Sequence, residues 1–72
     1  MLIKLNPNSL QIVKTSLNNT ERDLLPKSLN KIASHYPVLL TEVGIAITIT
    51  GEPKYLYSSL HELTFNYDLE IM

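Results

Sequence analysis

Two stretches in the second half of the chain, Val43–Thr50 and Leu63–Ile71, alternate large apolar residues with small or polar ones. Successive side chains of a β-strand point to opposite faces, so this alternation is typical of a strand with one buried and one exposed face. The pattern predicts strands near Val43–Thr50 and Thr64–Ile71 in one sheet. It constrains the architecture of the chain and leaves its activity open.

The composition predicts a single folded domain over residues 1–72. Apolar residues make up 44% of the chain and charged residues only 18%, which favours a buried core over a disordered chain. The chain contains no cysteine, so neither a disulfide nor a thiolate zinc site reinforces this small core. A net charge of -1 without any basic run disfavours nucleic acid as a partner.

The sequence gives no indication of a membrane segment. No apolar run approaches the roughly 20 residues that a membrane-spanning helix needs. The segment Met1–Leu5 also lacks the apolar region and the cleavage pattern of a signal peptide. We therefore expect no membrane partner and a cytoplasmic location.

The first half of the chain predicts a short strand and then a helix. The strand candidate Leu2–Leu5 ends at Asn6, which is a favoured helix N-cap and is followed by a proline suited to the first helical position. The helix expected over Pro7–Leu17 leaves Ile12 on the side opposite its apolar face. That face consists of Leu10, Val13 and Leu17.

A second helix is expected over Pro26–Tyr36. Proline inside a helix removes a hydrogen bond and clashes with the preceding turn, so Pro26 is placed at the helix start. Pro37 disfavours helical geometry at the residue before it and ends the helix. The apolar stripe of this helix consists of Leu25, Leu29, Ile32, Ala33 and Tyr36.

Residues 52–62 fit two structures. As a helix the segment begins at Pro53 and has a face of leucines, whereas as a strand it alternates Tyr55 and Tyr57 with other side chains. We prefer the helix. A helix here would act as a crossover between parallel strands, and a strand would give an antiparallel meander.

Together these patterns predict an α+β fold, a small single domain with two N-terminal helices packed on a sheet of three or four strands. The expected order of elements is β-α-α-β-(α or β)-β. The expected core consists of Leu10, Val13, Leu17, Leu29, Ile32, Ile45, Ile47, Phe65, Tyr67 and Leu69.

The sequence predicts no catalytic, cofactor-binding or metal site. His35 and His61 are the only histidines, and neither has a second good ligand at helical spacing. Ser58 and Ser59 precede His61, but a catalytic triad needs a spatial arrangement that sequence neighbours rarely provide, and the glycines of a nucleophile elbow are missing. With only two glycines, the chain has no phosphate-binding loop.

The tyrosines are the strongest candidates for contact with a partner, because tyrosine offers a large amphipathic surface at low entropic cost. A helix over residues 52–62 does not turn both Tyr55 and Tyr57 toward its leucine face. The last predicted strand also offers unpaired backbone groups if it lies at a sheet edge. The candidate partner-binding residues are Tyr55, Tyr57, His61, Asn66, Asp68 and Glu70.

Three function classes follow from these observations. The preferred one is a non-catalytic protein-binding module, such as a small inhibitor, adaptor or regulatory subunit, with a protein partner or a second copy of itself. The alternative is a nucleic-acid-associated regulator, an antitoxin-like dimer in which Lys27 and Lys31 meet phosphates. The third is a small enzyme that uses His35 or His61.

Overall fold

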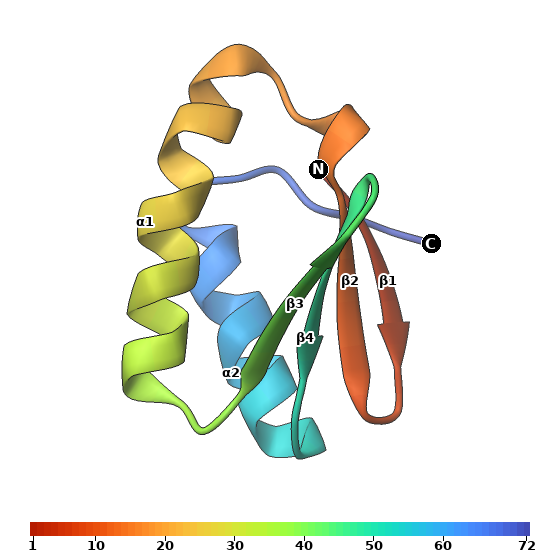
Figure 1. Ribbon diagram of the computed structural model, residues 1–72, viewed down its shortest axis with the longest axis vertical. Helices are drawn as coiled ribbons and strands as arrows, with labels where there is room; N and C mark the ends of the chain where they lie inside the picture. The colour runs from red at the N-terminus through yellow and green to blue at the C-terminus, as the bar shows by residue number, and fades with distance from the viewer.

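Two helices cover one face of a five-stranded mixed sheet in the computed structural model, which describes all 72 residues (Figure 1). The order of elements is β-β-α-β-β-α-β. The fold is therefore α+β, but the prediction of two N-terminal helices on three or four strands is wrong. The elements are β1 (Leu2–Asn6), β2 (Ser9–Val13), the short 3₁₀ helix η1 (Lys14–Ser16), α1 (Asn19–His35), β3 (Leu39–Val43), β4 (Ala46–Thr50), α2 (Pro53–Thr64) and β5 (Glu70–Ile71).

The strands lie side by side in the order β3-β4-β2-β1-β5. β1 and β2 form one hairpin, β3 and β4 form another, and the antiparallel pairing of β2 with β4 joins the two hairpins. After α2 the chain crosses to the β1 side of the sheet (Figure 1). There β5 pairs with β1 in parallel. As a result β3 and β5 are the two edges of the sheet.

The helix expected over Pro7–Leu17 is wrong, because this segment forms the turn of the first hairpin, β2 and η1. The turn has two residues, since Asn6 pairs with Ser9 across it. Leu10 and Ile12 alternate onto the inner face of the sheet and are both completely buried. A helix would have left Ile12 outside, whereas a strand between two neighbours buries both side chains.

The helix expected over Pro26–Tyr36 begins earlier, directly after Asn18. The Asn18 side chain accepts a hydrogen bond from the Glu21 N–H at 2.8 Å, and the Glu21 carboxylate accepts one from the Asn18 N–H at 3.0 Å. This capping box satisfies two donors that the first turn leaves free. Pro26 lies exposed inside α1, so its cost of about 3 kcal/mol is offset by the cap and by the apolar face that α1 buries.

The strand expected over Val43–Thr50 is confirmed for Ala46–Thr50 but is not continuous, because a turn splits the alternating run into the end of β3 and the whole of β4. Val43 pairs with Ala46, so the turn consists of Gly44 and Ile45. Gly44 has a φ of +57°, a left-handed conformation that glycine adopts without steric cost. A two-residue turn projects from the sheet, and the Ile45 side chain is 60% exposed there.

The C-terminal part gives one confirmation and one correction. The helix preferred for residues 52–62 is confirmed as α2, with Pro53 in its first turn. The strand expected over Thr64–Ile71 is wrong, because α2 continues to Thr64 and the strand that follows contains only two residues. The last stretch of alternation therefore belongs to the end of a helix, a loop and a brief parallel pairing with β1.

The core lies between the inner face of the sheet and the two helices. Five expected core residues are buried, namely Leu10, Leu17, Ile32, Ile47 and Tyr67. Three are half-buried, namely Val13, Leu29 and Leu69. The prediction that Ile45 and Phe65 belong to the core is wrong. Ile45 lies exposed in the turn, and Phe65 is the exposed C-cap residue of α2. No helix combines the length and the apolar character that a membrane crossing requires.

Candidate protein-binding edge and groove

The outer side of β3, which we call the β3 edge, has no strand beside it, because β3 pairs only with β4. Two hydrogen bonds, from the Lys14 N–H to the Ile45 carbonyl and from the Gly51 N–H to the Asn8 carbonyl, show which residues of β4 bond to β2. Neighbouring residues of a strand bond to opposite sides, so the residues of β4 that bond to β3 are Ala46, Thr48 and Thr50. Their partners are Val43, Thr41 and Leu39, which leaves the backbone groups of Leu40 and Glu42 directed toward solvent.

The β3 edge carries few of the features that keep sheet edges from pairing with other chains. The strand contains no proline and no lysine, two residues that commonly protect edges. Leu39 and Val43 are 66% and 69% exposed. The single charge on the strand is Glu42, which forms an ion pair with Lys14 of η1. β5, the opposite edge, offers only two residues for pairing.

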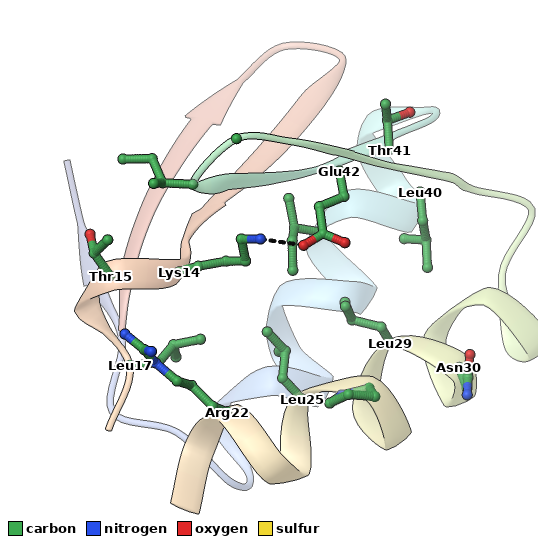
Figure 2. A pocket seen from close by; sticks show the side chains of 14 residues that line it. Lys14, Thr15, Leu17, Arg22, Leu25, Leu29, Asn30, Leu40, Thr41 and Glu42 are labelled. Atoms are coloured by element: carbon green, nitrogen blue, oxygen red, sulfur yellow. Dashed lines mark hydrogen bonds and ion pairs between the residues drawn. The ribbon is translucent and has the colours of Figure 1, made fainter. Parts of the chain in front are cut away.

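A groove of about 700 Å³ lies beside the β3 edge, between α1 and the β3–β4 hairpin (Figure 2). β3 starts near the C-terminal end of α1, and the hairpin diverges from α1 toward its turn (Figure 1). We call it the α1–β3 groove. Its apolar lining consists of Leu17, Leu25, Leu29, Leu40, Ile45 and Ile47.

The two cations of the groove lie at one end. Figure 2 shows Lys14, Thr15 and Arg22 at this end, with Asn30 and Leu40 at the other. Lys14 reaches across to Glu42, so its charge is compensated within the chain. Arg22 takes part in no ion pair. The groove therefore combines an apolar floor with one uncompensated cation.

The outer face of the sheet is not covered by either helix (Figure 1). The strand registers place its residues in rows across β3, β4, β2 and β1. One row is apolar and consists of Val43, Ala46, Val13 and Leu2. The next row is polar and consists of Thr41, Thr48, Gln11 and Lys4. A strand added at the β3 edge would extend both rows.

The structure separates the tyrosines of the predicted partner-binding set. Tyr57 and His61 are four residues apart and exposed on α2, and the His61 ring meets the Phe65 ring edge-on with centroids 5.1 Å apart. Together Tyr57, His61 and the C-cap residue Phe65 form an exposed aromatic stripe along α2, which we call the α2 stripe. Tyr55 points elsewhere, because it is half-buried and its ring centroid lies 6.3 Å from that of Tyr36. Phe65 was missed as a surface residue because its alternating neighbours predicted a strand.

The other three predicted residues are exposed and lie beyond the end of α2. Asn66 follows the helix, Asp68 lies in the loop and Glu70 begins β5. Their backbone has a structural role: the Asp68 carbonyl accepts a hydrogen bond from the N-terminal ammonium at 2.7 Å, and the Glu70 N–H donates to the Met1 carbonyl at 2.9 Å. The six predicted residues therefore do not form one continuous site.

Three side chains considered for catalysis, those of His35, Ser58 and Ser59, form hydrogen bonds with backbone carbonyls of their own helices. The His35 Nδ1 lies 2.8 Å from the Lys31 carbonyl oxygen. The Ser58 and Ser59 hydroxyls donate to carbonyls one turn earlier, at 3.0 and 2.7 Å. Nowhere in the structure do three or more His, Asp or Glu side chains gather as metal ligands. This arrangement offers no nucleophile paired with a base.

The β3 edge and the α1–β3 groove were not predicted from the sequence. Gly44, one of the small residues in the alternating run, was the available signal for a break in the strand. The position of β3 at the edge depends on which strands pair, which no local pattern contains. Comparison of the chain with protein-family models, with curated proteins and with solved structures finds no match.

Proposed function

We propose that this protein is a non-catalytic protein-binding module that takes up an extended segment of another protein along β3. The observation that carries the proposal is the unpaired β3 edge directly beside an apolar groove. In strand addition, main-chain hydrogen bonds supply affinity and pockets for alternate side chains supply specificity. Both requirements meet at this one place on the molecule.

The geometry of the edge specifies how the segment would bind. Its backbone would bond to the outward groups of Leu40 and Glu42. Alternate side chains would then point to the inner side of the sheet, into the α1–β3 groove, and the others to the outer face. A module of this kind acts as an inhibitor, adaptor or regulatory subunit. The absence of cysteine fits the reducing cytoplasm, where we expect it to act.

The two other function classes have less support. Lys31 of the proposed DNA-facing helix lies 3.5 Å from the Glu62 carboxylate, which compensates its charge. Phosphate binding relies on clustered free cations, and α1 does not present such a cluster. For an enzyme, His35 and His61 would each need a reactive partner, and the His61 ring instead meets the Phe65 ring edge-on.

The test is to select peptides from a random heptapeptide display library on three proteins: the wild type, Leu40→Pro and Leu40→Ala. Both substitutions remove the leucine side chain from the groove, but only proline removes the outward N–H and places its ring at the edge. We expect enriched peptides on wild type and on Leu40→Ala, and none on Leu40→Pro. Circular dichroism checks that each variant is folded.

Two results would contradict the proposal. One is a wild-type protein that enriches no peptide. The other is a set of peptides that bind a folded Leu40→Pro variant as well as they bind Leu40→Ala, because backbone pairing at β3 would then be irrelevant. Protection of the Leu40 and Glu42 amides from hydrogen exchange on binding provides an independent measurement.

A further inference from the structure

We infer that the segment bound along β3 carries two apolar side chains at alternate positions and a carboxylate at the next alternate position, which Arg22 binds. The inference rests on the proposed function and specifies the chemistry of the partner. It follows from the charge balance of the α1–β3 groove and from the spacing of the residues along α1.

The charge balance of the groove favours an acidic partner. The groove is lined by two cations, Lys14 and Arg22, and by one carboxylate, Glu42. Since Lys14 and Glu42 bind each other, one positive charge remains, although the whole chain has a net charge of -1. A carboxylate brought into the groove would meet the one side chain there that lacks an ionic partner.

Arg22 is held in a suitable position for this role. Its backbone N–H donates to the Asn18 carbonyl at 2.9 Å in the first turn of α1, and this bond fixes the backbone from which the side chain extends. The adjacent carboxylate of Glu21 is already used in the capping box. Arg22 itself is exposed and lines the groove at its charged end (Figure 2). A planar guanidinium binds a carboxylate through two parallel hydrogen bonds.

The spacing along α1 matches the spacing of a strand. Alternate side chains of a strand are about 6.8 Å apart, and residues four apart in a helix are separated by about 6 Å along its axis. Leu29 and Leu25 are four residues apart, and Arg22 follows one turn before Leu25. If two alternate side chains of the bound segment lie over Leu29 and Leu25, the next side chain on the same face of the segment therefore lies close to Arg22.

The first experiment uses a synthetic peptide that fits this pattern in either strand direction. Its sequence is aspartate-threonine-valine-threonine-valine-threonine-aspartate with blocked ends, and the matched probe replaces both aspartates with asparagine. Fluorescence anisotropy measures the Kd of both peptides for wild type, Arg22→Gln and Lys27→Gln. Lys27 is the control because it is exposed on the same helix and does not line the groove.

We expect wild type and Lys27→Gln to bind the aspartate peptide about fivefold more tightly than the asparagine peptide, an effect of the size expected for an exposed ion pair. Arg22→Gln should bind the two peptides equally. Equal affinities on wild type, or a preference that survives in Arg22→Gln, would overturn the inferred carboxylate and leave strand addition intact.

A second readout does not depend on the chosen peptide. Heptapeptides selected from the display library on wild type should be enriched in aspartate and glutamate, and selection on Arg22→Gln should remove this enrichment. Peptides without acidic enrichment overturn the inference, whereas the absence of any selected peptide overturns the proposed function itself. A wild type that sediments at twice the chain mass while Leu40→Pro is monomeric would show that a second copy occupies β3, which also overturns the inference.

Discussion

Replacing Ile49 with alanine tests the hairpin that creates the β3 edge, when compared with the same replacement at Ile45. Ile49 is fully buried in β4, whereas Ile45 is 60% exposed in the turn. Ile49→Ala removes three buried carbons, worth about 2.4 kcal/mol at about 0.8 kcal/mol each. The cavity left behind raises the expected loss to about 3–4 kcal/mol, within the range for buried isoleucine truncations.

The effect should be easy to measure because the domain is small. A chain of 72 residues has a total stability of about 4–11 kcal/mol, so the loss would lower the Tm by more than about 10 °C. Ile45→Ala should stay within about 0.5 kcal/mol of wild type. Urea denaturation followed by circular dichroism gives both values. Similar losses for the two variants would refute the turn at Gly44 and support a continuous strand through it.

Two further predictions concern the start of α1 and the aromatic stripe of α2. Asn18→Ala should lower the free energy of unfolding by about 1 kcal/mol through loss of the cap, and a loss no larger than that of the exposed Asn66→Ala in the same urea titration would argue against the capping box. Tyr57→Ala should leave stability within about 0.5 kcal/mol and weaken retention of any partner that binds the α2 stripe, whereas Tyr55→Ala should destabilise the fold because its ring packs against another tyrosine. Equal stability losses in the two tyrosine variants would contradict this division of roles.

The aromatic stripe and the β3 edge are separate surfaces with different modes of recognition. The stripe of Tyr57, His61 and Phe65 presents side chains from one face of a helix, and only part of it was expected. The β3 edge presents backbone groups and a groove. A variant in one surface is therefore a control for binding at the other, provided that its fold is intact.

Local sequence favoured the correct structure for α2 and identified part of the core. Pro53 suits the first turn of a helix, and a leucine face follows it at helical spacing, so both signals lie within the element that they describe. The buried residues Ile32 and Ile47 were also expected, because each belongs to an apolar face that remains apolar when the element boundaries move by several residues.

Local sequence was misleading where two local rules competed. Pro26 favoured a late start for α1, whereas the Asn18–Glu21 capping box together with the buried apolar face outweighs the missing hydrogen bond. Leu10 and Val13 fit a helix and a strand almost equally well, and the completely buried Ile12 distinguishes the two only once neighbouring strands are present.

The sequence by itself determined that the chain forms an α+β domain with a half-buried sheet, and it favoured a helix at α2, because periodicity and proline positions act within a few residues. Tertiary structure alone decided the strand order, and with it the exposure of the β3 edge and the opening of the α1–β3 groove. The pairing of β2 with β4 brings together segments more than thirty positions apart in the chain. Which strand has an unpaired edge depends on all these pairings at once, so the candidate binding site follows from the assembled sheet.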